Sequence, residues 1–290
     1  MSDSSLVTDK LILNIGPSHP ITHGTLRIQV ELDGETIQRT GCEIGYLHRG
    51  AEKLSESLDY RGSLGFQDRT DYLAAFCNEW VHVNATERLA GVESPERVEY
   101  IRLILSELNR ILSHLMFMGA FGTDVGIFGT AFTWAFKLRE TIQDFFEAVT
   151  GDRMMYNYFR VGGLAWEPHE TFVEDGRWLL DQIDEGIADL DALMTQHEVM
   201  IVRCRDVGLL SAEDAVNFGV TGPLLRASGV PFDLRVDEPY SIYDRFDWEI
   251  PVGERGDVYD RYLVRLEEMH QSVHIVRQAL EQLPASGPIM

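Results

Sequence analysis

Two histidines, His19 and His23, lie in the segment GPSHPITHG between two short apolar runs. Prolines and glycines stiffen such a segment, so a turn between strands can hold an imidazole still. An acidic partner would select the tautomer of that imidazole and raise its pKa, which suits a group that donates a proton. The same composition is also typical of a plain turn. By itself, the segment slightly favours this purely structural interpretation.

A metal site is a second possibility, because Glu267 and His270 form a Glu-x-x-His pair and His274 follows one turn later. Di-iron helix bundles use this pair, but they need a second copy and two further glutamates. The sequence has no second copy, and both histidines lie beside the apolar seam of the last helix. We therefore expect a solvated helix flank here. We expect His114 to be a hydrogen-bonded, partly buried histidine.

Composition excludes several classes of protein. The net charge of -22 argues against binding to nucleic acid or anionic lipid, both of which need a basic face. Cys42, Cys77 and Cys204 are far apart, form no CxxC, and suggest a reducing cytoplasm. Because apolar stretches stay well below the roughly 20 residues that span a bilayer, we expect membrane association only through partners.

Nucleotide and serine-hydrolase motifs are also missing. The glycine-rich segment GAFGTDVGIFG follows a predicted helix instead of a strand, and it lacks the G-x-G-x-x-G order. The sequence contains neither G-x-x-x-x-G-K-[ST] nor G-x-S-x-G. We expect this chain to bind no nucleotide.

Two kinds of structure must position these side chains, a small sheet and a helical bundle. Together they predict an α+β fold. Residues 1–65 contain short apolar runs with an Asp-Gly between two of them, the signal of a hairpin, and predict a small antiparallel sheet. Residues 66–290 predict a helical bundle. Its helices are expected from an N-cap at Ser94 with Pro95 in the first position, over 131–148, over 170–196, and from Ser211.

The last helix has the most regular pattern. Its apolar residues alternate steps of four and three: Tyr262, Leu266, Met269, Val273, Val276, Leu280 and Leu283. This spacing predicts a seam that packs against neighbouring helices. Before it, residues 221–256 show no regular period and predict a long functional or packed loop.

Seven motifs in order give the chain a family resemblance. They are LNIGPSHPITHGTLRIQVELDGE, IGYLHRGAEKL, DRTDYLAAF, RLILSELNRILSHLMFMGAFGTDVG, NYFRVGG, GVTGPLLRASGVPFDLR and GERGDVYDRYLVRLEEMHQSVHIVRQALE. Over residues 11–288 they closely resemble the D subunit of respiratory complex I, which forms the quinone site of this proton-pumping NADH:quinone oxidoreductase.

The resemblance also relates the fold to the large subunit of nickel-iron hydrogenases, which hold their metal on two CxxC pairs. Where those enzymes have the first pair, this chain reads Asp71-Tyr72-Leu73-Ala74. Nickel needs thiolate ligands, so hydrogenase activity is excluded and no metal is expected here.

The resemblance implies roles for four residues. His23 and Tyr72 would flank the quinone headgroup, and Asp124 would contact His23. A quinone that takes up two electrons also needs two protons, which a phenol and a cationic imidazole can donate. Arg69 matches an arginine near an iron–sulfur cluster held by a neighbouring subunit, whose potential it would tune. His19 would only support the turn.

The family also implies partners and a location. These partners are the cluster-bearing B subunit, the C subunit and membrane-arm subunits, with the protein held peripherally on the cytoplasmic side of the plasma membrane. Enzyme activity would belong to the assembled complex, with NADH bound elsewhere. Alternatives are the same subunit of a ferredoxin- or deazaflavin-driven quinone oxidoreductase, or a non-redox assembly paralogue.

Two departures from the family pattern stand out. Tyr156 takes the place of a frequent histidine near the cluster, and tyrosine does not titrate at neutral pH. The chain also ends at Met290, whereas the family continues. We therefore expect a C-terminal segment of the family fold to be lacking.

Overall fold

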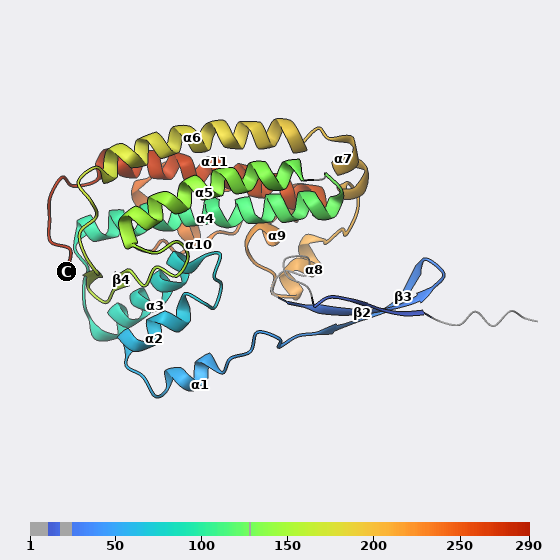
Figure 1. Ribbon diagram of the computed structural model, residues 1–290, viewed down its shortest axis with the longest axis horizontal. Helices are drawn as coiled ribbons and strands as arrows, with labels where there is room; N and C mark the ends of the chain where they lie inside the picture. Colours follow the sequence, from blue (N-terminus) through green and yellow to red (C-terminus); the bar gives the residue numbers. More distant parts are fainter. Residues whose placement is uncertain (1–10, 18–24, 128) are drawn as a thin grey trace, which may run out of the picture. The chain divides into compact units, whose positions relative to one another are not determined.

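The computed structural model describes residues 11–17, 25–127 and 129–290 (Figure 1). Its chain divides into two compact units, residues 1–57 and 58–290. This division lies before the expected boundary at residue 66, because α2 (Tyr60–Gln67) packs against α3 (Ala75–Ala90) of the second unit. The fold is α+β, as predicted.

The described residues of the first unit form an antiparallel sheet and one short helix. In the sheet, β2 (Arg27–Asp33) lies between β1 (Leu11–Ile15) and β3 (Thr36–Glu43). Asp33 pairs with Thr36 across a two-residue turn, in which Gly34 has a φ of 61° that favours glycine. The predicted Asp-Gly hairpin is therefore confirmed. Helix α1 (Ala51–Ser55) follows.

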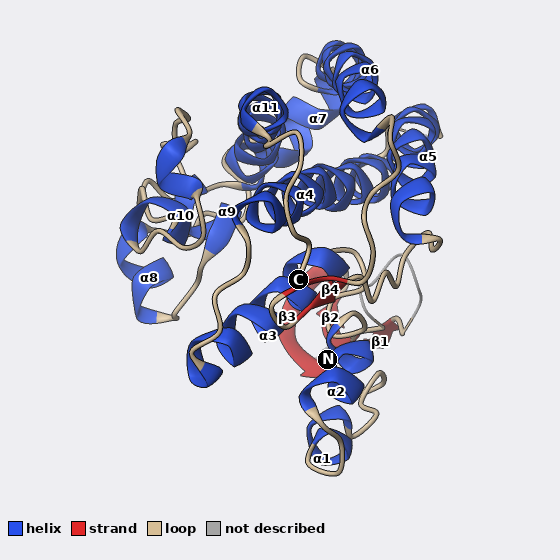
Figure 2. Ribbon diagram, turned by 90° about the vertical axis from the view of Figure 1, so that its left-hand side faces the viewer, coloured by secondary structure: helices blue, strands red, loops and turns tan. Residues whose placement is uncertain are grey.

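The second unit is built on four long helices. Helix α4 (Glu96–Val125) packs on α5 (Thr130–Thr150) and α11 (Val258–Gln282), and α6 (Phe172–Met194) packs on both of these. Figure 2 shows this ring of four helices nearly end-on, with α3 and α2 below α4. The remaining elements are short: β4 (Phe159–Arg160), β5 (Gly163–Leu164), α7 (Glu198–Cys204), α8 (Ala212–Asn217), α9 (Gly222–Ala227), α10 (Leu234–Asp237) and η1 (Tyr243–Arg245).

Helix α4 forms the centre of the unit. Its predicted apolar positions, including Ile104, Leu108 and Leu115, are all buried. The helix starts one residue later than predicted: Pro95 is the extended N-cap, and the Ser94 hydroxyl donates to the Glu99 carboxylate instead of capping the helix. Proline suits this place because its φ is preset and it has no N–H to leave unsatisfied.

The predicted seam of α11 is confirmed, because the seam residues that lie within this helix are all buried, and the helix packs on α4 and α6. They are Tyr262, Leu266, Met269, Val273, Val276 and Leu280. Ser211 caps α8 as predicted, accepting a hydrogen bond from the Asp214 N–H at 3.0 Å. The segment 221–256 is less irregular than predicted. It contains α9, α10 and η1, which are too short to produce a visible hydrophobic period.

Within the described residues, no helix combines the length and the apolar character that crossing a membrane requires.

Truncating the seam should destabilise the chain. Met269 is fully buried, whereas His274 on the same helix is exposed. We expect Met269→Ala to lower the free energy of unfolding by about 2–5 kcal/mol, because it removes packing and leaves a cavity. His274→Ala should change it by less than about 0.5 kcal/mol. Urea denaturation of both variants tests this, and equal losses would contradict the seam.

Candidate functional site

Tyr72 lies on the loop between α2 and α3. The loop is ordered by Asp71, whose carboxylate accepts a hydrogen bond from the Leu73 N–H at 3.2 Å. The Asp71 carbonyl accepts two more, from the Ala74 N–H at 3.0 Å and from Asn78 Nδ2 at 2.9 Å. These bonds form an Asx-type turn, so the half-buried Tyr72 is carried by a well-defined backbone.

A buried asparagine fastens this loop to the centre of the unit. Asn109 of α4 donates from Nδ2 to the Leu73 carbonyl at 3.2 Å and accepts from the Phe76 N–H at 3.1 Å. The Phe76 N–H belongs to the first turn of α3, where backbone donors have no partner within the helix. One amide side chain therefore supports both the backbone beside Tyr72 and the start of α3.

Asp124 lies in the last turn of α4, with an exposed side chain. The helix ends at Gly126, whose φ is 103°, and Arg203 donates to the Val125 carbonyl at 2.7 Å. A carboxylate is disfavoured at a helix C-terminus by the helix dipole, so a nearby cation would stabilise it. Asn109 and Asp124 are 15 residues apart, or about 22 Å along the axis. The Tyr72 loop is thus fastened to α4 at Asn109, whereas Asp124 belongs to the far end of the same helix.

His23 and His19 lie outside the described residues. The predicted contact between His23 and Asp124, and the place of His23 beside a quinone, therefore stay predictions.

Arg69 follows the end of α2 and has an exposed side chain, which donates to the Gly65 carbonyl at 2.5 Å. Across α3, Tyr156 is buried and stacks on Phe76, with ring centroids 3.9 Å apart. Burial raises the pKa of Tyr156 further above neutrality.

The histidines that the sequence offered as metal ligands are not gathered into a metal site among the described residues. His270 is half-buried and His274 is exposed. His114 Nε2 lies 2.7 Å from Glu268 Oε2, which confirms a hydrogen-bonded histidine. Burial lowers the pKa of His114. Burial would raise the pKa of Glu268, but His114 and Arg226 lower it to about 2. In residues 11–17, 25–127 and 129–290, no three metal-ligating side chains lie together.

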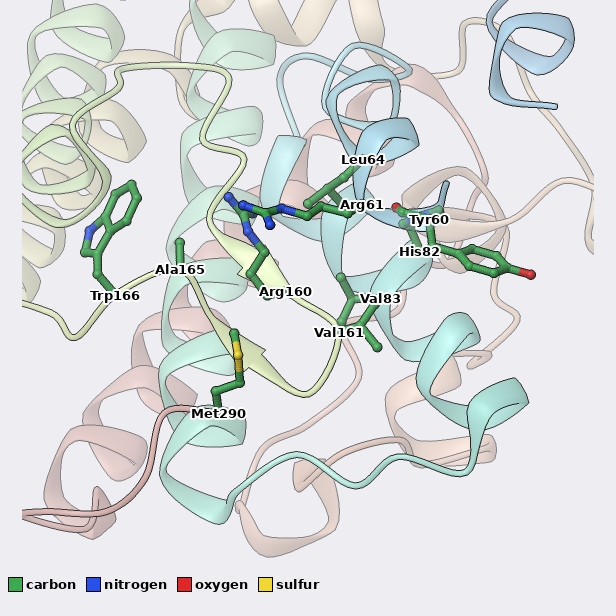
Figure 3. A pocket seen from close by; sticks show the side chains of 10 residues that line it. All are labelled: Tyr60, Arg61, Leu64, His82, Val83, Arg160, Val161, Ala165, Trp166 and Met290. Carbon is green, nitrogen blue, oxygen red and sulfur yellow. The ribbon is translucent and has the colours of Figure 1, made fainter. Parts of the chain in front are cut away.

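Among the described residues of the second unit, two cavities bear on the site. The larger, of about 830 Å³, lies between α3, α4 and the segment around α9 and α10, and its lining includes Asp71, Cys77 and Arg110. Burial raises the pKa of the Cys77 thiol to about 11, so the thiol stays protonated. The smaller cavity, of about 520 Å³, is shown in Figure 3, where Arg61 and Arg160 extend toward each other.

Sequence reasoning missed two buried acids beside the loop, Asp68 and Glu79, both fully buried. Asp68 directly precedes Arg69, and Glu79 lies in the second turn of α3. A signal for Glu79 was present, because it falls three residues after Phe76 and four before Val83, on the apolar face of a helix.

Comparisons with known proteins agree on one family. Residues 124–290 match the family model described as respiratory-chain NADH dehydrogenase, 49 Kd subunit. The D subunit of the NADH-quinone oxidoreductase of Desulforamulus reducens is 45% identical over 98% of this chain and 77% of its own. The proteins of the same name from Dehalococcoides mccartyi and Geotalea uraniireducens are 46% and 47% identical over 99% and 98% of this chain, and over 78% and 72% of their own.

Removing the amide of Asn109 should loosen the loop. In Asn109→Ala the Leu73 carbonyl and the Phe76 N–H lose their partner, at a cost of about 1–3 kcal/mol each. We expect a lower unfolding free energy and faster hydrogen exchange at Phe76. Ser113→Ala, one turn further along α4, is the control and should stay within about 0.5 kcal/mol of the wild type. Unchanged exchange at Phe76 in Asn109→Ala would show that Asn109 does not support the loop.

Proposed function

Because the chain belongs to the family of the 49-kDa subunit of respiratory-chain NADH dehydrogenase, we propose that it is a core subunit of a proton-pumping NADH:quinone oxidoreductase. In this proposal it forms the quinone-reduction cavity together with a neighbouring iron–sulfur subunit. The observation that carries the proposal is 45–47% identity over at least 98% of the chain, a span that includes the Tyr72 loop and α4.

The chemistry of the loop supports a quinone as the substrate. Reduction to the quinol adds two electrons and two protons, one to each carbonyl oxygen. The Tyr72 phenol is an O–H donor that can hydrogen-bond one carbonyl oxygen and donate a proton to it. Its half-buried position on a loop held by Asn109 would keep that donor in place while excluding part of the water.

The second proton is assigned to His23, with Asp124 stabilising its cationic form. Asp124 suits this role because its carboxylate is exposed at a helix end that favours a cation nearby. Each turnover would change the charge of the His23–Asp124 pair before it is reprotonated. We propose that this change of charge is coupled to proton pumping.

The electrons would come from an iron–sulfur cluster on a neighbouring subunit. Burial raises the pKa values of the thiols of Cys77 and Cys204, which disfavours the thiolate form that binds iron. Arg69 presents an exposed guanidinium beside the Tyr72 loop, where its positive charge would raise the potential of a nearby cluster. The buried Tyr156 would contribute no titration near neutral pH.

The remaining proposals concern the assembly. We propose contacts with the cluster-bearing B subunit, the C subunit and the membrane arm, and a peripheral location on the cytoplasmic side of the plasma membrane. The isolated chain would be inactive. The relatives are named NADH-quinone oxidoreductases, which favours NADH over ferredoxin or a deazaflavin as the donor and a redox role over assembly.

Replacing the Tyr72 phenol should impair quinone reduction specifically. In membranes containing the assembled complex, we expect Tyr72→Phe to lower NADH:quinone activity about 100-fold or more, because a positioned proton donor is lost. Electron transfer from NADH to an artificial acceptor should be unchanged. Tyr60→Phe, at an exposed tyrosine of α2, is the control. Wild-type quinone reduction in Tyr72→Phe would refute the assignment.

Substitutions of the two histidines in the segment GPSHPITHG should differ in their effect on quinone reduction. We expect His23→Ala to reduce quinone turnover at least tenfold, since proton donation by a positioned side chain is lost. His19→Ala should retain most of the activity, and both complexes should assemble. The assay is quinone reduction in membranes, with the amount of each subunit checked by blotting. Equal effects of the two substitutions would argue against a proton-donating role for His23.

A further inference from the structure

Two buried carboxyl groups, Asp68 and Glu79, touch each other beneath the Tyr72 loop. Both side chains are fully buried, and both carboxyl groups bind the adjacent backbone N–H groups of residues 157–159, which brings them together. An ionised carboxylate only accepts hydrogen bonds, so two carboxyl groups can bond each other only when one of them carries a proton.

The other partners of this pair are backbone amides. Asp68 Oδ2 accepts from the Asn157 N–H at 3.1 Å. Glu79 Oε2 accepts from the N–H groups of Tyr158 and Phe159, at 2.9 and 2.8 Å. In the part of the chain that the structure describes, the remaining oxygens, Asp68 Oδ1 and Glu79 Oε1, are buried and accept no hydrogen bond from an N–H or O–H group. A proton shared between the two carboxyl groups satisfies both.

The surroundings of the pair stabilise a negative charge at Asp68, whereas burial and the charge of Asp68 disfavour a second one at Glu79. Arg69 at the end of α2 and Arg160 of β4 stabilise an anion at Asp68, and Arg61 lies beyond Arg160. On the far side are the phenol of Tyr156 and, next to it, Arg139 of α5. Burial raises the pKa of Asp68, and burial together with the charge of Asp68 raises that of Glu79 well above its ordinary value of 4.5.

The pair also closes the loop that carries Tyr72. Asp68 is the C-cap of α2 and Glu79 lies in the second turn of α3, so a proton shared between them would link the two ends of the intervening segment. Through Asn157, Tyr158 and Phe159 the same pair holds the strand segment behind the loop. Asn109 of α4 supports the Tyr72 loop at Leu73 and Phe76, between the two residues of the carboxyl pair.

We propose that the Asp68–Glu79 pair, holding one shared proton, positions the Tyr72 loop for quinone reduction, and that loss of this proton releases the loop. The inference rests on the proposed function for its link to quinone. With both groups ionised, two negative charges would be in contact in a buried place, and their repulsion would separate α2 from α3. Asp68 and Glu79 are thus positioning residues, and Tyr72 is the group that meets the substrate.

The shared proton can be tested on the full chain alone. A protonated carboxyl gives its own infrared carbonyl band, which we expect at pH 7 in the wild type and not in Glu79→Gln. The amide of this variant still accepts from the backbone and donates to Asp68, but it has no proton to lose. Glu174→Gln, at an exposed position on α6, is the control and should retain the band. No band in the wild type, or a band kept in both Glu79→Gln and Asp68→Asn, overturns the proposal.

The dependence of stability on pH has a definite sign. Since the folded pKa of Glu79 is raised, the stability that its proton contributes is fully present below 4.5 and is lost as the pH rises toward the folded pKa. We therefore expect the Tm of the wild type to fall with rising pH relative to that of Glu79→Gln. Parallel Tm curves for the two proteins overturn the proposal.

The positioning role is tested in the assembled complex. We expect wild-type quinone reduction to fall at alkaline pH, Glu79→Gln to lack this fall, and Glu79→Ala to lose about 10- to 100-fold in kcat/KM at every pH because the loop is misplaced. The same alkaline fall in Glu79→Gln as in the wild type contradicts the positioning role. If the infrared band behaves as expected but Tyr72→Phe reduces quinone normally, the proton pair stands and the proposed function fails.

Discussion

The buried carboxylate of Glu107 in α4 is the interaction on which the second unit depends. It accepts hydrogen bonds from Arg235 of α10 at 3.2 Å, Tyr243 of η1 at 2.5 Å and Ser272 of α11 at 2.6 Å. Burial would raise its pKa, but Arg110 and Arg235 lower it well below the ordinary range. Breaking such a buried pair costs about 3–5 kcal/mol, because the partner charge stays buried. This network holds the short elements of residues 221–256 in place.

Four of the buried acids of this unit form two kinds, which differ in their partners. Glu107 and Glu268 face arginines and stay ionised, so they act as fixed joints between elements. Asp68 and Glu79 face each other and backbone amides, so they retain a proton and can respond to pH. The joints of the first kind stabilise the helical ring. The Asp68–Glu79 pair lies at the Tyr72 loop, which we propose contacts the quinone.

Some of the site could be predicted from local pattern, and some could not. The periodicity of α4 and α11 depends on one helix face at a time, so their buried positions were predicted correctly. The start of α4 was placed one residue early, because Ser94 is a good cap by type but bonds Glu99 instead. The helices α9 and α10 escaped prediction because four to six residues are too few to show a period.

The sequence by itself determined the family and the helix faces, since these depend on residue order alone, and it predicted Tyr72 and Asp124 as site residues. Only the tertiary structure decided which groups surround the buried acids. Glu79 and Glu107 are both glutamates on largely apolar helix faces, and the main local difference is Arg110, which lies three residues after Glu107. One meets a carboxyl group from α2 and the other meets arginines. Because a pKa is set through space by burial and neighbouring charge, the fold shifts the pKa values of these two acids in opposite directions.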